Sequence, residues 1–385
     1  MKGIERSDVV FWGPINESGP GLFFTGLCRV LSDHGLKVTA ITHKSQRDQL
    51  MDKFDIIEVH NLRDYLRVCV VLSKSRRTVL AYHMETTPPP FACLLRFLCS
   101  IPMVPVIVGS DWFDSIRPRL LSGSRLDQLR AYCIDKLYQM LSQGPSIVAS
   151  TKEIVGTLNR TYKIPLTHLA VVPGAVVDLG LFMNDPTCTS IATTILFVGR
   201  LSSENGVDTL IASMNHIVRR RSDARLVIVG DGPLRSELES LVDRLGISGH
   251  VEMVGLVPHR DVPRYMKSAT LAAFPFIWRA GAGNVVFEAM AMELPVVISE
   301  ANETIEELVR AKCVVGVSPC DEEALANGIL RLLNDIDLRR SYGATGRRYV
   351  QENLSDSQIT SIWFTLIHTV RELVHQHSIP GTASS

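Results

Sequence analysis

The stretch ILFVGRLSSENGVDTL, from Ile195 to Leu210, runs from an aliphatic segment through a glycine and a polar loop into a helical pattern. A short apolar run that ends in turn residues is typical of a buried β-strand, and apolar residues three and four apart are typical of an α-helix. LVIVGDGPL, from Leu226 to Leu234, begins the same order again. Each stretch predicts a strand that leads into a helix, which is the repeating unit of a parallel sheet.

The same alternation extends over the whole chain. The expected strands of the first half are Val9–Gly13, Lys37–Thr42, Ile56–His60, Thr78–Tyr82, Val104–Val108, Ser146–Ala149 and Ala170–Val172. Those of the second half are Ile195–Val198, Leu226–Val229, Val251–Val254, Leu271–Phe274, Pro295–Ile298 and Val314–Val317. Helical patterns between them include Gly21–His34, Leu126–Leu141, Gly206–Arg219, Leu234–Leu245, Val262–Lys267, Asn284–Met292 and Glu322–Leu333. Because 385 residues are too many for one ordinary core, we expect an α/β protein with two doubly wound domains.

The segment NDPTCTSIAT, from Asn184 to Thr193, is polar and rich in turn residues, and it predicts the domain boundary. We expect one domain over residues 1–185 and a second over residues 186–355. A helical pattern follows over residues 356–378, and its apolar stripe should pack on one of the domains. The last residues, 379–385, are typical of a disordered tail.

The overall charge excludes some classes of function. Lys+Arg and Asp+Glu each number 40 and the pI is about 7.2, so no net positive charge favours nucleic acid. The charged start MKGIERSDVV is not typical of a secretory signal, and the apolar stretch 91–109 is interrupted by Arg96, Pro102 and Pro105. We expect a cytoplasmic protein, with a peripheral contact at the cytoplasmic face of the membrane left open.

Ligands of doubly wound sheets bind beyond the carboxyl ends of the strands, so the loops there carry the candidate residues. Arg200 follows the strand of the opening stretch, and a guanidinium group at this place suits a diphosphate because it offers several fixed donors. Taken alone, Arg200 is more simply explained by pairing with a neighbouring acid at the surface. Gly230 follows the next strand, in a tight turn where backbone must approach backbone or a ligand.

The stretch RAGAGNVVFEAMA, from Arg279 to Ala291, joins a glycine-rich loop to an apolar helix. Gly281, Ala282 and Gly283 leave room for a ligand, and the N-terminus of a helix that begins at Asn284 favours a phosphate. Glu288 lies one turn later on the same face of this helix. A buried carboxylate is costly unless donors satisfy it, and either two ribose hydroxyls or a structural ion pair inside the domain would do so.

The first half carries weaker signals. Gly19 and Gly21 lie in an expected loop between the first strand and the first helix, but the pattern is not GxGxxG. The second strand also ends without an acidic residue, which argues against a dinucleotide-dependent dehydrogenase. His83 and Asp111 follow two further strands. Each alone is more often structural than catalytic, but together they lie at one edge of one expected sheet, which favours a functional role.

Taken in order, these motifs resemble the retaining glycosyltransferases of the GT-B fold, glycosyltransferase family four. The matching segments are GPGLFFTGL, VVPGAVVDLGLF, FVGRLSSENGVDTLI, LVIVGDGPLRSELE, VEMVGLVPHRDVPRYMKSA and GAGNVVFEAMAMELPVVIS. The resemblance implies two facing Rossmann-like domains with a cleft between them. The domain over 1–185 would bind the acceptor, the domain over 186–355 would bind the nucleotide sugar, and the helix over 356–378 would cross back to the first domain. The implied reaction moves a sugar from a nucleotide-diphosphate donor to an acceptor hydroxyl with retention of configuration.

The resemblance also implies a role for each matching residue. Arg200 would bind the donor diphosphate, and His83 and Asp111 would lie near the transferred sugar or the acceptor, so these three are the candidate catalytic residues. Glu288 would hold the ribose hydroxyls, and Val257 would lie near the base. The other implied donor-binding positions are Gly19, Gly21, Asn205, Gly230, Ala280, Gly281, Ala282, Gly283 and Asn284.

Two positions depart from the family pattern. Asn205 stands where the family usually has Lys, which removes a positive charge from the diphosphate site. Ala280 stands where the family places the first of two glutamates, beside the donor sugar. A non-catalytic donor-binding subunit of a transferase complex is therefore the alternative function. A sugar-nucleotide epimerase is disfavoured by the segments GRL and EAMA.

The expected partners follow from the same resemblance. The donor would be a nucleotide sugar such as a UDP- or GDP-sugar, with no further cofactor and no metal site. The acceptor would be a glycan, a lipid-linked molecule or a small molecule, and nucleic acid is not expected. The apolar segment PPPFACLLRFLCSIPM, with Arg76, Arg77, Arg96, Arg117 and Arg119 nearby, could touch a membrane surface. The simpler interpretation of this segment is an ordinary core helix.

Overall fold

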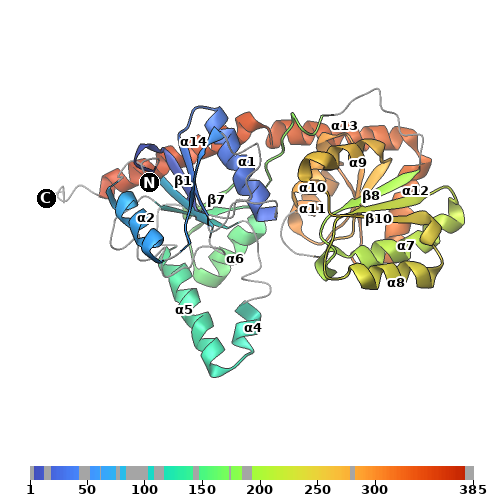
Figure 1. Ribbon diagram of the computed structural model, residues 1–385, viewed down its shortest axis with the longest axis horizontal. Coiled ribbons are helices and arrows are strands. Elements are labelled where there is room, and N and C mark those ends of the chain that lie inside the picture. The colour runs from blue at the N-terminus through green and yellow to red at the C-terminus, as the bar shows by residue number, and fades with distance from the viewer. Residues whose placement is uncertain are drawn as a thin grey trace. The chain divides into compact units, whose positions relative to one another are not determined.

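The chain forms two compact units (Figure 1): unit 1 comprises Met1–Val176 and Asp356–Ser385, and unit 2 comprises Val177–Ser355. The computed structural model describes residues 4–12, 19–42, 53–60, 62–74, 79–83, 103–107, 117–141, 147–172, 175–183, 193–277 and 282–377. The expected limit between residues 185 and 186 falls outside these ranges. The C-terminal segment belongs to the unit that the first half of the chain forms.

Unit 1 is built on a seven-stranded sheet in the order β3-β2-β1-β4-β5-β6-β7. Every neighbouring pair of strands is parallel. All residues of β1 and β2 are buried, as is typical of parallel strands that helices cover on both faces. The strands are β1 (Val9–Trp12), β2 (Val38–Thr42), β3 (Asp55–Glu58), β4 (Val79–His83), β5 (Met103–Ile107), β6 (Ile147–Ala149) and β7 (Leu169–Val171).

The helices of unit 1 are α1 (Gly19–Asp33), α2 (Leu62–Lys74), α4 (Arg117–Leu121), α5 (Arg125–Leu141), α6 (Lys152–Tyr162) and α14 (Asp356–His377). Helices α1, α2, α6 and α14 contribute to two hydrophobic clusters, one on each face of the sheet, and α4 and α5 extend away from it (Figure 1). Successive side chains of a strand point to opposite faces. Val9 and Phe11 therefore join the cluster with α1 and α14, whereas Val10 and Trp12 join the cluster with α2 and α6.

Unit 2 is built on a six-stranded sheet in the order β10-β9-β8-β11-β12-β13. All its strand pairs are parallel. The strands are β8 (Thr194–Val198), β9 (Arg225–Val229), β10 (Val251–Gly255), β11 (Leu271–Phe274), β12 (Val296–Ser299) and β13 (Val315–Val317). The helices are α7 (Val207–Arg220), α8 (Arg235–Leu245), α9 (Val262–Ser268), α10 (Asn284–Ala291), α11 (Glu303–Arg310), α12 (Glu322–Asn334) and α13 (Ile336–Asn353).

Each sheet reverses its strand order once. In unit 2 the chain proceeds from β8 through β9 to β10, and then returns to β11 on the other side of β8. In unit 1 the same reversal lies between β1 and β4. The loops that follow the two strands at such a reversal diverge, and the crevice between them is where ligands of doubly wound sheets bind. The topology therefore places the candidate site of unit 2 beyond β8 and β11.

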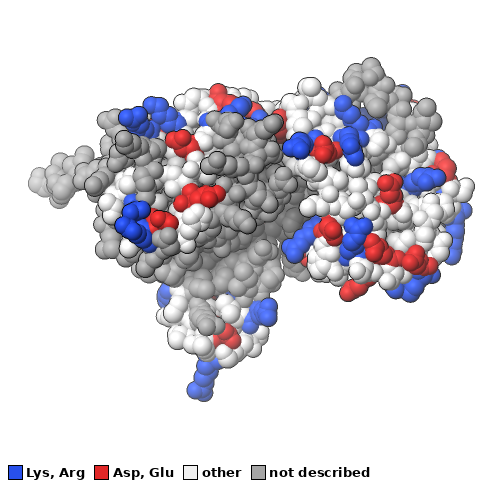
Figure 2. All heavy atoms as spheres, in the orientation of Figure 1, with Lys and Arg blue, Asp and Glu red and all other residues white. Residues whose placement is uncertain are grey.

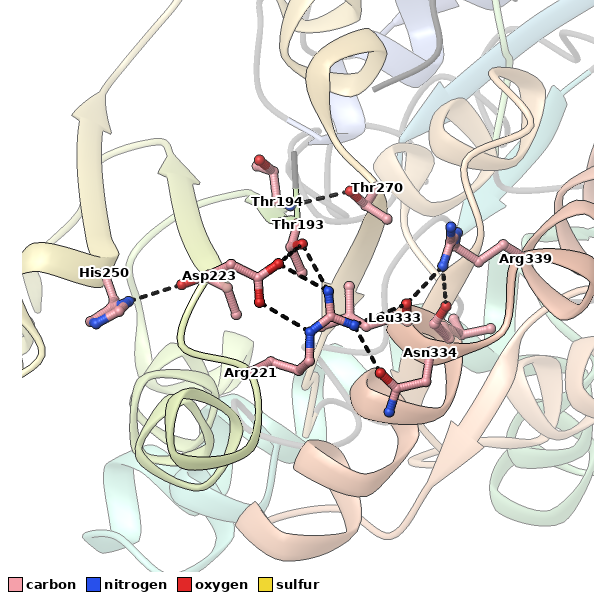
Figure 3. Close-up of polar contacts among 11 residues, drawn as sticks. Thr193, Thr194, Arg221, Asp223, His250, Thr270, Leu333, Asn334 and Arg339 are labelled. Carbon is pink, nitrogen blue, oxygen red and sulfur yellow. Dashed lines mark hydrogen bonds and ion pairs between the residues drawn. The ribbon is translucent and has the colours of Figure 1, made fainter. Parts of the chain in front are cut away.

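A polar cluster lies at the amino ends of the strands in the unit 2 sheet, opposite the edge that carries the candidate site (Figure 3). Arg221, directly after α7, donates to Asp223 through Nε (3.0 Å) and Nη2 (2.9 Å) and to Asn334 Oδ1 (2.8 Å). The hydroxyl of Thr193, directly before β8, donates to Asp223 Oδ2 (2.5 Å). Arg339 of α13 donates to the carbonyl oxygens of Leu332 and Leu333 at the end of α12. These bonds tie the C-terminal ends of α7 and α12 to the start of β8.

The strands expected from the sequence are present in both units, and their ends are shifted by at most two residues. The expected loop at Gly19 and Gly21 is wrong, because α1 begins at Gly19 and both glycines lie in its first turn. Pro20 fits this turn because the first residues of a helix have no intrahelical partner for their N–H groups. No helix within the residues described above has the length and apolar character needed to cross a membrane.

Candidate functional site

Loops that follow β8, β9, β10 and β11 are joined by backbone hydrogen bonds at the carboxyl edge of the unit 2 sheet. The N–H of Gly199 donates to the carbonyl oxygen of Val229 (2.9 Å), and the N–H of Gly230 donates to that of Gly255 (2.8 Å). The N–H of Ile277 donates to the carbonyl oxygen of Glu204 (3.0 Å). The loops on which the sequence placed donor-binding residues are therefore one connected layer.

Gly230 has a structural reason to be glycine. Its φ of +138° is rarely adopted by other residues, and a Cβ at this position would overlap the carbonyl oxygen of Gly199. Gly206 is similar, with a φ of +61° and the carbonyl oxygen of Pro275 in the way of a Cβ. The turn signal at Gly230 thus reflects the close approach of the loops after β8 and β9.

Arg200 lies two residues after the end of β8, next to Gly199, and is exposed. Its acidic neighbour is Glu204. Burial of Glu204 opposes ionisation, but hydrogen bonds from its own N–H and from the hydroxyls of Ser202 and Ser203, together with the charge of Arg200, lower its pKa. The acid that the simpler explanation of Arg200 requires is therefore present. The guanidinium group also stays accessible to a ligand.

Asn205 lies buried in a short 3-10 helix, Ser203–Asn205. Its side-chain N–H donates to the carbonyl oxygen of Arg200 (2.6 Å), and its Nδ2 lies 3.5 Å from the hydroxyl of Ser202. Asn205, which stands at the position of the family's usual Lys, therefore fixes the loop that carries Arg200.

The N-terminus of α10 faces this layer without a side-chain cap. The residue before the helix is Gly283, with a φ of +75°, and glycine has no side chain that could accept a hydrogen bond from the first turn. Ala282 is buried and Asn284 is half-buried. The first N–H groups of a helix lack intrahelical partners and carry its positive dipole end, so this terminus is suited to an anion.

Glu288 lies one turn after Asn284 on the same face of α10, and it is 4% exposed. Its Oε1 is 2.8 Å from Nε2 of His259, which belongs to a short 3-10 helix after β10, His259–Asp261. The sequence left a ribose and an ion pair inside the domain as partners of Glu288, and the structure provides a partner inside the domain. Sequence reasoning did not assign His259, although its place shortly after a strand end was a signal.

The other expected site residues divide between the two units. Val257 is half-buried in the loop after β10, beside Leu256, which is 80% exposed. His83 is the last residue of β4, at the strand reversal of the unit 1 sheet. Asp111, Ala280 and Gly281 lie outside the described residues. The structure thus brings eight expected positions to one edge of unit 2: Arg200, Asn205, Gly230, Val257, Ala282, Gly283, Asn284 and Glu288.

A metal site would need several ligating side chains close together. Among the residues whose positions are described, no group of three or more His, Cys, Asp or Glu side chains could hold a metal ion. Figure 2 shows basic and acidic side chains interspersed over the visible face of unit 2. Attraction of a negatively charged ligand would therefore come from single groups, Arg200 and the start of α10, and not from a broad basic patch on this face.

Comparison with known protein families finds matches for the second half of the chain. The family described as glycosyl transferases group 1 matches residues 191–349. Alpha-D-kanosaminyltransferase of Streptomyces kanamyceticus is 31% identical over 145 residues, which are 38% of this chain and 37% of the relative. A GDP-mannose-dependent alpha-(1-6)-phosphatidylinositol monomannoside mannosyltransferase of Mycobacterium tuberculosis is 31% identical over 163 residues, which are 41% of this chain and 42% of the relative. The chain thus matches less than half the length of these curated relatives.

Two solved structures resemble nearly the whole chain. HepE of Anabaena, crystallised in complex with UDP, has a TM-score of 0.76 at 15% identity and covers 94% of this chain and 100% of its own. Sucrose-phosphate synthase of Thermosynechococcus elongatus has a TM-score of 0.75 at 18% identity and covers 96% of this chain and 100% of its own. At such low identity the likeness shows the fold alone. The chain therefore has the GT-B fold with its two Rossmann-like domains, and its residues 191–349 match the family described as glycosyl transferases group 1.

Proposed function

We propose that the protein is a glycosyltransferase that moves a hexose from a nucleoside-diphosphate donor to an acceptor hydroxyl with retention of configuration. The observation that carries the proposal is the uncapped start of α10 with Glu288 one turn behind it, at the strand reversal of unit 2. A phosphate suits the first feature and a ribose suits the second. The matched relatives include a kanosaminyltransferase and a GDP-mannose-dependent enzyme, and HepE was crystallised with UDP.

The chemistry depends on the leaving group. When the bond between the anomeric carbon and the phosphate oxygen breaks, negative charge develops on the diphosphate. Arg200 and the N–H groups at the start of α10 would stabilise this charge, because both are fixed before the reaction begins. Removal of one such donor typically lowers the rate by about 100- to 1000-fold.

Retention is proposed to come from front-face attack. A covalent intermediate needs a carboxylate nucleophile close to a second carboxyl group, and Ala280 stands where the family places one of its two glutamates. The acceptor oxygen would instead form its bond to the anomeric carbon on the face that the diphosphate leaves. Its proton would pass to the departing phosphate oxygen.

The test is a panel of UDP-, GDP- and ADP-sugars, assayed for transfer and hydrolysis with the full chain. We expect one donor to be consumed, Arg200→Ala to lower its turnover by about 100-fold or more, and Glu288→Ala to weaken nucleotide binding. Arg219→Ala is the matched control, because Arg219 is exposed at the far end of α7. Binding of nucleotides without consumption of any donor would contradict the transferase and leave the non-catalytic donor-binding subunit. The cytoplasmic location and the absence of a metal or further cofactor stay predictions.

A membrane-bound acceptor is supported by a surface of unit 1 that we call the α4–α5 surface. It consists of exposed apolar and basic side chains: Leu121, Leu126, Leu129 and Tyr132 with Arg119, Arg125 and Lys136. Figure 1 shows α4 and α5 extending away from the sheet, and Figure 2 shows basic side chains on this part of the unit. Apolar residues bordered by positive charge fit an anionic lipid surface.

The α4–α5 surface only partly overlaps the membrane segment expected from the sequence. Residues 88–102, with Arg96, and the arginines Arg76 and Arg77 lie outside the described ranges. Arg117 is held by Asp135, with Nε 2.9 and 3.0 Å from the two carboxylate oxygens, so it serves the structure of unit 1. Arg119 is exposed and stays a candidate for lipid contact.

Vesicle co-sedimentation tests this contact. The full chain should bind vesicles that contain phosphatidylglycerol and not vesicles of phosphatidylcholine alone. The double variant Leu126→Ser, Leu129→Ser should lose this binding. Leu166→Ser is the matched control, because Leu166 is 61% exposed elsewhere on unit 1. Equal binding by the double variant and the wild type would overturn the proposed contact.

A further inference from the structure

Glu288 has its polar partner in a loop that the proposed chemistry does not use. The carboxylate is almost fully buried in α10, and one of its oxygens, Oε1, lies 2.8 Å from Nε2 of His259. The histidine side chain is 24% exposed. A carboxylate oxygen accepts, so Nε2 carries the proton and donates it. The direction in which Glu288 presents its carboxylate is therefore coupled to His259.

The imidazole of His259 is itself held in place. Its ring centroid lies 5.4 Å from that of Phe182, which is 1% exposed. Phe182 ends a turn in which the carboxylate of Asp178 accepts from the N–H groups of Gly180 and Leu181 (both 3.0 Å). The N–H of Phe182 also donates to the carbonyl oxygen of Asp178 (2.8 Å). The motif VVDLGLF, whose role the sequence left open, thus supports the ring that contacts Glu288.

The backbone of Glu288 is fixed from the other end of its helix. Nη1 of Arg347, in α13, donates to the carbonyl oxygen of Ala291 at the end of α10 (2.6 Å). A Cβ at Gly343 of α13 would overlap the carbonyl oxygen of Glu293, so the two segments are in close contact. With the helix held at this end, the remaining freedom of Glu288 is the rotation of its side chain, and His259 restricts that rotation.

We propose that His259 is a positioning residue for the donor nucleotide, which rests on the proposed function: it holds Oε1 of Glu288 so that Oε2 accepts hydrogen bonds from the ribose hydroxyls. A buried carboxylate without a fixed donor is free to turn toward another partner or to take up a proton, and in either state it loses acceptor capacity. Groups that orient a binding residue commonly affect affinity although they do not touch the ligand. His259 makes the ribose preference of the site depend on the loop after β10.

The test compares ribose and dideoxyribose ligands. Dissociation constants of the full chain are measured for UDP, GDP and ADP, and for the 2′,3′-dideoxy analogue of the nucleotide that binds best. His259→Ala should weaken binding of that nucleotide by about 10-fold, as expected for loss of a hydrogen bond to a charged group. It should leave binding of the dideoxy analogue within about 2-fold, since that ligand offers no hydroxyl to Glu288. His259→Gln should restore part of the loss, because its amide N–H can donate to the carboxylate.

His250→Ala is the matched control. His250 lies directly before β10, at the opposite end of the strand from His259, and its Nδ1 is 3.0 Å from the carbonyl oxygen of Ala224 (Figure 3). This variant should bind both ligands as the wild type does. A thermal unfolding curve for each variant identifies any that does not fold.

The outcomes separate the inference from the proposed function. An equal loss of affinity for both ligands in His259→Ala would show a merely structural role and overturn the inference. The inference also fails if Glu288→Ala weakens nucleotide binding and His259→Ala does not. Failure of the wild type to bind any of the three nucleoside diphosphates would contradict the proposed function itself.

Discussion

The side chain of Asn205 donates to the carbonyl oxygen of the residue that carries the expected diphosphate contact, Arg200. Asn205→Asp keeps the shape and replaces the donor by a charged acceptor that faces that carbonyl oxygen. We expect the free energy of unfolding to fall by about 1–3 kcal/mol, because a buried polar pair becomes repulsive and unsatisfied. Urea denaturation measures the change. A variant as stable as the wild type would show that this contact does not hold the loop.

A glycine series separates backbone strain from steric overlap. Gly230 combines a positive φ with the carbonyl oxygen of Gly199 in the way of a Cβ. Gly246 has a positive φ of +66° with open space, and Gly249 has open space and an ordinary φ. We expect alanine to cost about 4 kcal/mol or more at Gly230, about 1 kcal/mol at Gly246 and almost nothing at Gly249. Denaturation midpoints give this order, and equal midpoints at Gly230 and Gly246 would contradict the role of the overlap.

The sequence indicated which residues would lie at the carboxyl edge of the unit 2 sheet, but not the contacts that they make there. Arg200 and Gly230 stood out because charged residues and glycines after strands carry local signals, and Glu288 stood out as a carboxylate within an apolar helix. The partner of Glu288 could not be found in this way, since His259 is 29 residues away and its ring orientation depends on tertiary packing. Ordinary sequence spacing indicates which edge of a sheet a residue occupies, but not which side chains meet there.

At the scale of elements, strands were easier to predict than helices. Buried parallel strands are continuous aliphatic runs between turn residues, so their positions are visible in the sequence. Of the helices of unit 2, α11 and α13 were not predicted. Helix α13 contains Gly343 and Gly346, which normally weaken a helix, but here they allow close contact with Glu293 and Met290. A tertiary contact thus outweighs the local propensity, and a single sequence does not show it.

The cluster that ties α7 and α12 to β8 should make unit 2 sensitive to acid. Hydrogen bonds from Arg221 and Thr193 hold the pKa of Asp223 well below its usual range. A carboxyl group with a depressed pKa contributes stability above its unfolded value of about 3.9, and this contribution is lost as the pH falls through the folded value. Asp223→Asn should therefore lower Tm at pH 7, and the difference from the wild type should shrink below about pH 4. An equal difference in Tm between Asp223→Asn and the wild type at pH 7 and below about pH 4 would contradict the role of the charge. Thermal unfolding at both pH values measures it.

At the scale of the whole molecule, the last helix couples the end of the chain to the unit formed by its beginning. Helix α14 packs on α1 and β4, and the apolar stripe of the sequence, at Ile359, Trp363, Leu366 and Val370, is buried. Arg371 adds a hydrogen bond to the carbonyl oxygen of Asp8 (2.9 Å). Unit 1 therefore includes α14, and its stability depends on a segment far from its sheet in sequence.

Trp363→Ala tests this dependence. The indole ring is fully buried, with its centroid 5.2 Å from the ring of Phe11 in β1 and an interplanar angle of 72°. Truncation of a buried Trp typically costs about 3–5 kcal/mol, and the loss should fall on unit 1 alone, because the two units have separate cores. Differential scanning calorimetry should show the unit 1 transition at a lower temperature and the unit 2 transition unchanged. Phe364→Ala, at a neighbouring position that is 43% exposed, should change neither. A shift of the unit 2 transition by Trp363→Ala would mean that α14 also stabilises unit 2.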